Sequence, residues 1–298
     1  MRIEDKPITD IPSLYDAVTK AKEVFTGQVW WRGQRDYSWT LLPSLFRSHT
    51  EYDEISGNSR FVNRAYARHT NVPSASEWPN WLFLMQHYRF PTRLLDWTES
   101  PLIAAFFASE IDECHLKYPG KIADADGALF ALSPYKLNEK QVDTDKLLVP
   151  QDERCTRAMA PAFDEHAEAS DKVIAVRPAE VDVRLMVQIS EFTLNGYEIA
   201  LEKLPSSDQF ILKFRVIKDS KELILKELKR LGVRLSSIFP DLEHLAEEIR
   251  QLKFRRSDDE QNVADNGEPG IDDPKPRNLG KIPIWPASPG QMGESDTG

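Results

Sequence analysis

The chain has 298 residues, 41% of them hydrophobic and 10% aromatic, which is enough for a sizeable core in one large domain or two small ones. Its formal net charge of -10 argues against duplex binding by overall charge, and Cys114 and Cys155 are too few for a disulfide framework and are not spaced as metal ligands. No apolar run approaches the roughly 20 residues of a membrane span, and the first six residues lack the apolar run typical of a signal peptide, so we expect a cytoplasmic protein with no membrane partner.

The predicted elements begin with an amphipathic helix over residues 8–25, because apolar side chains recur there at helical spacing, and Gly27 follows it. Val29-Trp30-Trp31 is typical of a short buried strand, which ends at Arg32-Gly33-Gln34. The next predicted helix covers residues 59–70.

A third helix is predicted from about Trp78 to Tyr88, where Phe90-Pro91 stops it. Pro101 begins a fourth, strongly apolar helix that runs to Ala108. The remaining predicted elements are strands at 127–132, 173–176, 186–189 and 210–217, a helix over 220–231 and a last helix ending near 252.

The composition changes at Ser257, after which acidic residues, Gly, Pro, Asn and Ser dominate. Such a segment cannot bury enough apolar surface to fold, so it predicts disorder. We therefore expect one α+β domain over residues 28–255, an N-terminal helix within residues 1–27 that packs on it, and an acidic disordered tail at 256–298.

The first candidate for chemistry is Arg32-Gly33-Gln34. Arginine offers a rigid fork of donors for phosphate or carboxylate, glycine lets a backbone or a ligand approach closely, and Gln34 can bind an amide or a hydroxyl. The alternative is that Arg32 makes a structural ion pair at the end of a strand.

The second candidate is the segment 86–98, where His87, Thr92, Arg93 and Asp96 stand among apolar residues. Buried polar groups are costly unless each finds a partner, so the segment indicates either a binding site or a structural network. His87 stands at a helix C-terminus, where it binds a ligand or caps the last carbonyls. Arg93 and Asp96 can pair with each other, either in a pocket wall or as a buried salt bridge.

The third candidate is the predicted strand around Gln188, Ser190 and Glu191. Gln188 and Ser190 share one face of a regular strand, and Glu191 points to the other face or lies in the following turn. A glutamate near a cleft can steady a positive charge or orient a hydroxyl, and the alternative is an exposed glutamate at a strand end. The sequence contains no dinucleotide, P-loop, zinc or serine-hydrolase motif, so no metal is expected.

These segments together resemble the FRG domain family. Trp31-Arg32-Gly33-Gln34 resembles the Phe/Tyr-Arg-Gly-Gln motif that names the family, residues 41–47 resemble its Pro-Ser-Leu-Phe-Arg block, and residues 86–98 resemble its most specific block, Gln-His-Tyr-Gly-Leu-Pro-Thr-Arg-Leu-Leu-Asp-Trp-Thr. The match spans roughly residues 28–250. Arg89 stands where the family usually has Gly, and Ser190 stands where a Gly-x-Phe pattern is expected.

FRG domains are distantly similar to ADP-ribosyltransferases, which split NAD in a cleft between two small sheets. The resemblance implies a mixed or antiparallel split sheet flanked by helices, with NAD as substrate. It implies that Arg32, with Gln34, holds the NAD phosphates or ribose, and that Gln188 or Glu191 polarises the acceptor or stabilises the oxocarbenium-like transition state. The residues that the resemblance places in the pocket wall are His87, Thr92, Arg93 and Asp96.

The leading hypothesis is therefore an ADP-ribosyltransferase-like enzyme that modifies a nucleic acid or a protein. The resemblance implies a bacterial context of toxin activity or phage defence, with an antitoxin or another regulatory partner. The first alternative is a non-catalytic module that binds a nucleotide or a nucleic acid, with phosphate contacts from Arg60, Arg64 and Arg68. The second is a purely structural role for the polar segment 86–98.

Overall fold

The computed structural model describes residues 1–47, 53–68, 72–110, 125–178 and 187–249, apart from residues 243 and 247. Two compact units divide the chain, Met1–Ile249 and Arg250–Gly298, and every described residue belongs to the first. The tail predicted at residues 256–298 and Cys114 lie outside the described residues.

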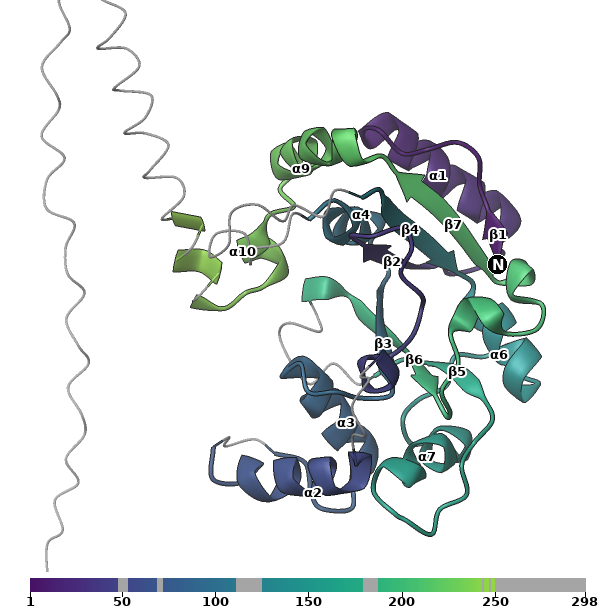
Figure 1. Ribbon diagram of the computed structural model, residues 1–298, viewed down its shortest axis with the longest axis vertical. Helices are drawn as coiled ribbons and strands as arrows, with labels where there is room; N and C mark the ends of the chain where they lie inside the picture. The colour runs from purple at the N-terminus through teal and green to yellow at the C-terminus, as the bar shows by residue number, and fades with distance from the viewer. Residues whose placement is uncertain are drawn as a thin grey trace, which may run out of the picture. The chain divides into compact units, whose positions relative to one another are not determined.

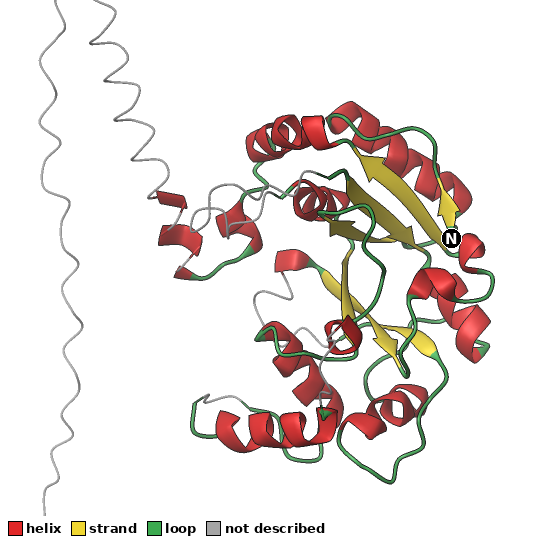
Figure 2. Ribbon diagram, in the orientation of Figure 1, coloured by secondary structure: helices red, strands yellow, loops and turns green. Residues whose placement is uncertain are grey.

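Seven strands form one sheet in the described part of the chain (Figure 2). The strands are β1 (Arg2–Ile3), β2 (Trp30–Gln34), β3 (Leu94–Thr98), β4 (Gly127–Leu132), β5 (Val173–Val176), β6 (Ser190–Asn195) and β7 (Ile211–Val216). Their order in the sheet is β1-β7-β4-β2-β3-β6-β5. β1 pairs with β7 in parallel, and the other neighbouring strands are antiparallel.

Helices flank this sheet (Figure 1). The α-helices are α1 (Ile11–Val24), α2 (Glu54–Ala65), α3 (Trp78–His87), α4 (Pro101–Ser109), α6 (Pro134–Val142), α7 (Glu153–Met159), α9 (Lys221–Arg230) and α10 (Leu235–Ile238). The short 3-10 helices are η1 (Ser44–Arg47), η2 (Ala160–Ala162), η3 (Leu201–Lys203), η4 (Ser207–Gln209) and η5 (Lys218–Ser220). The α+β class and the flanking helices are confirmed, whereas the likeness to an ADP-ribosyltransferase fold stays a prediction.

Local sequence explains where several helices begin. Asp10 and Ser13 form a reciprocal capping box at the start of α1. Ser100 caps α4, whose first residue is proline. Asp53 caps α2 by accepting from the Ser56 amide at 3.0 Å, so this helix begins five residues earlier than the predicted start at residue 59.

The sheet nearly parts between β2 and β3. These strands are joined at one residue pair, Trp31 with Thr98, whereas β2 and β4, like β3 and β6, are paired along five residues. The sheet therefore has two halves, one with β1, β7, β4 and β2 and the other with β3, β6 and β5. Beyond the single pair, the facing edges of β2 and β3 are open to side-chain contacts.

The core is layered accordingly. The outer face of the first half, with Trp31 and Phe214, packs under α1, α4 and α9 (Figure 1). The outer face of the second half, with Phe192, packs under α3 and α7. The inner faces of the two halves pack against each other through Trp30 and Trp97. Buried apolar side chains from both halves thus hold the parted sheet together.

Gly33 lets α4 approach β2 at backbone distance. A Cβ atom at Gly33 would lie 1.9 Å from the Ala104 carbonyl oxygen and 2.5 Å from the Ala108 amide nitrogen. Gly127 of β4 meets the same helix, where a Cβ would lie 2.3 Å from the Ala108 oxygen. The close approach expected at Gly33 is therefore that of a helix backbone.

The strand predicted at residues 186–189 is wrong for its described residues. Val187 and Gln188 are helical, Ile189 has a φ of 46°, and β6 begins at Ser190. The left-handed backbone at Ile189 interrupts any extended run, so Gln188 and Ser190 do not share a strand face. The Ile189 carbonyl instead accepts a hydrogen bond from the Glu99 amide at 3.2 Å.

Among the helices of the described residues, none combines the length and the apolar character that crossing a membrane requires.

Candidate functional site

Arg32 occupies the opening between the two halves of the sheet. Its Nη1 donates to the Asp96 carbonyl at 2.6 Å and lies 3.8 Å from the Asp96 carboxylate. Burial lowers the pKa of Arg32 to about 10, with Asp96 opposing the shift and Arg47 adding to it. The group stays cationic at neutral pH. Its Nε is buried and donates to no described residue, so the guanidinium keeps hydrogen-bonding capacity.

A hydrogen-bonded chain holds Asp96 from the side of α3. The Gln86 amide donates to the Asp96 carboxylate at 2.8 Å, and the Thr92 hydroxyl donates to the Gln86 side-chain oxygen. The Thr92 amide in turn donates to the Ser44 hydroxyl at 3.3 Å. These bonds tie η1, α3 and β3 together and orient the Asp96 carboxylate toward Arg32.

Arg47, at the end of η1, is the second cation beside Asp96. Its Nε donates to the Leu42 carbonyl at 2.7 Å. Burial lowers the pKa of Arg47, and the charge of Asp96 opposes that shift. Two arginines therefore act on one carboxylate, which leaves a local excess of positive charge suited to an anion. We call Arg32, Arg47, Gln86 and Asp96 the arginine cluster.

Arg93 does not pair with Asp96, so that prediction is wrong. The two residues stand three positions apart along an extended segment, which directs their side chains to opposite faces. Arg93 instead binds Glu54, with Nε 2.9 Å from Oε1 and Nη2 2.5 Å from Oε2. Its Nη1 donates to the carbonyls of Ala158 at 3.1 Å and Gly196 at 3.4 Å. Arg93 thus joins α2, α7 and the end of β6.

Gln34 and His87, the other two residues predicted for the pocket, make contacts of their own. Gln34 is 5% exposed; its Nε2 donates to the Thr40 carbonyl at 3.2 Å, and its Oε1 accepts from no described residue. His87 is the last residue of α3, so it stands at a helix C-terminus as predicted. Its ring packs edge-on against the Tyr88 ring, with the two ring centroids 4.9 Å apart.

Arg89 has a left-handed backbone, with a φ of 59°, at the position where the family pattern has glycine. The Phe90 amide donates to the Met85 carbonyl and the Arg89 amide to the Gln86 carbonyl, each at 3.0 Å. These are the contacts with which glycine commonly ends a helix.

Arg89→Gly is therefore expected to raise the free energy of unfolding by roughly 0.5–1 kcal/mol, because glycine adopts positive φ without the steric cost of a Cβ atom. Urea denaturation measures the change. The matched control is Arg60→Gly, in the interior of α2, where glycine should cost about 1 kcal/mol. A loss of stability at both positions would contradict the explanation.

Glu191, on β6, belongs to a separate polar group. Its side chain is 3% exposed, and Arg177 donates to its Oε1 from Nε at 2.6 Å. The Arg177 Nη2 also donates to Glu99 and to Gln28, each at 2.7 Å. Burial raises the pKa of Glu191 to about 8, Arg177 opposes the shift, and Glu99 adds to it. We call Gln28, Glu99, Arg177 and Glu191 the glutamate cluster.

The raised pKa of Glu191 makes stability depend on pH. Glu191 has an ordinary pKa of 4.5 in the unfolded chain and a pKa of about 8 in the folded chain, so between these pH values it binds more protons when the chain is folded. The stability that Glu191 contributes is therefore fully present below pH 4.5 and is lost as pH rises through 8. We expect the free energy of unfolding to fall by several kcal/mol more in wild type than in Glu191→Gln over this range. Urea unfolding at pH 5, 7 and 9 measures both. Parallel pH profiles would rule out a strongly perturbed Glu191.

The structure separates the sequence-predicted catalytic residues. Glu191 pairs with Trp97 of β3, and β3 lies between Glu191 and the β2 strand that carries Arg32. No hydrogen bond or ion pair among the described residues joins Arg32 to Glu191 directly. Gln188 contacts α10 instead, because its side-chain Nε2 donates to the Ile238 backbone carbonyl at 3.1 Å. The backbone carbonyl of Gln188 accepts from the Thr98 hydroxyl at 2.6 Å. Of the two late candidates, Glu191 has the perturbed carboxyl group.

Sequence reasoning missed Arg47, Gln86, Glu99 and Arg177. Arg47 and Gln86 stand at the ends of the two blocks that carry the family resemblance, which is a usable signal. Glu99 and Arg177 have no local signal, since they are 78 positions apart. Among the described residues, no three His, Cys, Asp or Glu side chains are placed to hold a metal ion.

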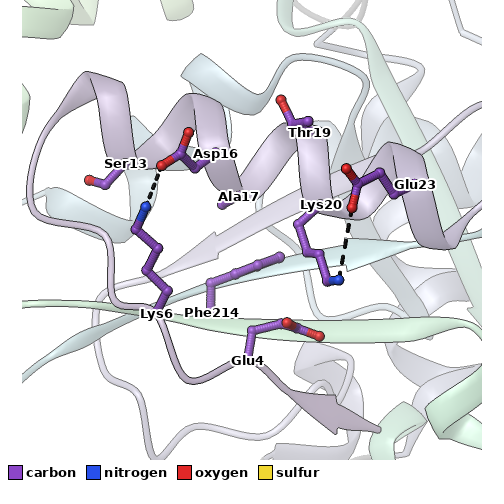
Figure 3. A pocket seen from close by; sticks show the side chains of 9 residues that line it. All are labelled: Glu4, Lys6, Ser13, Asp16, Ala17, Thr19, Lys20, Glu23 and Phe214. Carbon is purple, nitrogen blue, oxygen red and sulfur yellow. Dashed lines mark hydrogen bonds and ion pairs between the residues drawn. The ribbon is translucent and has the colours of Figure 1, made fainter.

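A groove of about 350 Å³ lies beside α1 (Figure 3). Phe214 lines it together with charged residues that largely neutralise one another, since Lys6 pairs with Asp16 and Lys20 lies 3.9 Å from Glu23. None of the residues predicted to form the site lines this groove.

The comparisons with known proteins identify one domain in the chain. The fold and the arginine cluster define an α+β protein whose central cation lies at the opening of a nearly parted sheet. The family model of the FRG domain matches residues 27–115, which contain Arg32 and Asp96, so this part of the chain is an FRG domain. The matched residues supply β2 and β3, and the other strands of the sheet lie outside them. No curated protein and no solved structure matches the chain.

Proposed function

We propose that this protein is an NAD-dependent ADP-ribosyltransferase-like enzyme in which Arg32 holds the NAD phosphates or ribose. The observation that carries the proposal is the state of Arg32. It is a largely buried cation, 16% exposed, whose Nε has no described acceptor. Arg47 adds a second positive charge next to it. Paired guanidinium groups are suited to a diphosphate, because each offers donors in a planar fork.

Asp96 and Gln86 keep the Arg32 side chain in position. Asp96 is 54% exposed, so its carboxylate is solvated and competes only weakly with a bound phosphate. Thr92 acts on this pair through Gln86. In the proposed enzyme, Gln34 and His87 contribute to the wall of the NAD site, whereas Arg93 supports it from behind through Glu54.

The proposed reaction transfers ADP-ribose to an acceptor. The bond from the ribose C1′ to nicotinamide breaks, nicotinamide leaves as a neutral molecule, and C1′ bonds to an acceptor oxygen or nitrogen that loses a proton. Positive charge develops on the ribose ring in the transition state, and a carboxylate nearby stabilises it. In the proposed enzyme, NAD spans from the arginine cluster across β3, and the Glu191 carboxylate stabilises the positive charge on the ribose. Glu191 stabilises this charge only when it is ionised.

The acceptor in this proposal is a nucleic acid or a protein. Arg60, Arg64 and Arg68 are exposed and recur every four positions along and just beyond α2, an arrangement that can follow a line of phosphates. A context of toxin activity or phage defence, with an antitoxin or another regulatory partner, rests on the family resemblance.

The test is incubation of the full chain with NAD labelled in its adenosine portion and a cell extract. We expect label transfer by wild type and a loss of roughly 100-fold or more in Arg32→Ala and Glu191→Gln. The control is Arg157→Ala, which removes an exposed arginine of α7 and should transfer label normally. Full transfer by both folded site variants would refute the proposal.

A second candidate is a non-catalytic module that binds a nucleotide or RNA in the same place. The exposed arginines at positions 60, 64 and 68 favour it, because phosphate contacts require no chemistry. This candidate predicts binding of NAD or RNA without nicotinamide release, weakening steeply with salt. Replacing the three arginines by alanine should then make the dependence of log RNA affinity on log salt concentration less steep, by the equivalent of about three phosphate contacts. Nicotinamide release by wild type would exclude this candidate.

A further inference from the structure

Glu99 and Glu191 meet on one nitrogen atom. The Arg177 Nη2 lies 2.7 Å from Glu99 Oε1 and 2.5 Å from Glu191 Oε1. Glu99 follows β3, Arg177 follows β5 and Glu191 stands in β6, so the sheet brings together three residues that are remote in sequence. Two carboxyl oxygens bound to the same nitrogen are necessarily close neighbours.

The charges of this group do not balance when both carboxyls are ionised. One guanidinium then faces two carboxylates, and Glu191 is 3% exposed against 30% for Glu99. Two neighbouring carboxylates cannot both ionise easily away from water. The more buried of the two takes the proton, which agrees with a pKa of about 8 for Glu191. The Glu191 Oε2 is buried and accepts from no described donor.

The other groups around Arg177 do not change this balance. Gln28 is neutral and accepts from the same Arg177 nitrogen. Burial lowers the pKa of Arg177, but Glu191 and then Glu99 raise it more, with a smaller contribution from Tyr135 of α6. Arg177 therefore stays cationic, and the titration near pH 8 belongs to Glu191.

We propose that Glu99 is a positioning residue that acts through Glu191, because the two side chains form a carboxyl pair that shares one proton at neutral pH. Glu99 is partly exposed and exchanges this proton with solvent, whereas Glu191 has little access to water. Loss of the proton produces the buried Glu191 carboxylate. The consequence for rate rests on the proposed function, whereas the shared proton does not.

Carboxyl ¹³C NMR of the full chain, labelled at the glutamate Cδ atoms, tests the pair directly. We expect Glu191, assigned with Glu191→Gln, to titrate near pH 8 in wild type. In Glu99→Gln its midpoint should fall by about one unit or more, because a neutral amide neither repels the carboxylate nor supplies a shared proton. The control is Glu198→Gln, an exposed glutamate that follows β6. An unchanged Glu191 midpoint in Glu99→Gln would overturn the pair, whether or not the protein has activity.

The pH dependence of label transfer tests the positioning role. Glu99→Gln should transfer ADP-ribose roughly five- to tenfold faster than wild type at pH 6.5 and equally fast above pH 9, because a lower pKa ionises more Glu191 at low pH. A midpoint that moves in NMR without a matching shift of the rate profile would refute the positioning role. A midpoint that moves in a protein without transfer at any pH would keep the pair and refute the proposed function.

Discussion

Replacing Gly33 by alanine is expected to lower the free energy of unfolding by about 3 kcal/mol or more. The added Cβ would lie 1.9 Å from the carbonyl oxygen of Ala104. That oxygen belongs to the backbone of α4, so a rotamer change cannot relieve the clash, and the helix must move away from β2 and from the core beneath it. Urea and thermal unfolding followed by circular dichroism measure the loss.

The matched control for this prediction is Gly232→Ala. Gly232 has a φ of 88° and no atom within 4 Å of an added Cβ, so alanine there should cost about 1–2 kcal/mol of backbone strain alone. Equal losses at the two positions would contradict the close approach of α4 to β2. A small loss at Gly33 would show that α4 is free to shift.

Arg93→Ala is expected to cost about 3–5 kcal/mol of stability. It would leave Glu54, whose side chain is 13% exposed, without its cation, and it would remove the donor to the Ala158 carbonyl. Replacing both partners, in Arg93→Met with Glu54→Leu, should cost less than Arg93→Ala alone, because no buried charge is then left unpaired. Unfolding by urea measures each variant.

The control for Arg93→Ala is Arg157→Ala. The Arg157–Glu153 pair has the same kind of contact, at 2.9 Å, but its side chains are 71% and 85% exposed, so it should contribute less than about 1 kcal/mol. Similar losses at Arg93 and Arg157 would refute the structural role of Arg93. The structural alternative for the polar segment therefore stays a prediction, which the buried contacts of Arg93 favour. The half-exposed Asp96 should tolerate replacement by alanine without unfolding.

Local patterns predicted the elements that local physics determines. Apolar periodicity indicated α1 and α9, Pro101 with the apolar run after it indicated α4, and an unbroken apolar run indicated β4, each close to its observed bounds. The end of α3 followed from Phe90-Pro91, and the glycine of the family pattern is explained by the positive φ of Arg89. In each case the cause lies within a few residues of its effect.

The contacts that build the site could not be predicted in this way. Arg32 and Asp96 are 64 positions apart, and their meeting depends on how β2 and β3 diverge. Arg93 pairs with Glu54, because strand alternation directs its side chain away from Asp96. The sequence spacing of Arg93 and Asp96 suggested a pair only because it ignored this alternation. The strand expected at Gln188 does not form, because Ile189 has a left-handed backbone. This could not be predicted, since a β-branched residue such as isoleucine favours extended backbone.

Titration of NAD into the full chain, followed by calorimetry, tests the central claim that Arg32 anchors an NAD site. We expect binding of one NAD per chain in wild type and a loss of affinity of roughly tenfold or more in a folded Arg32→Ala variant, because a charge-assisted contact to phosphate is removed. Unchanged binding in that variant, or no binding of NAD by the folded wild type, would contradict the account.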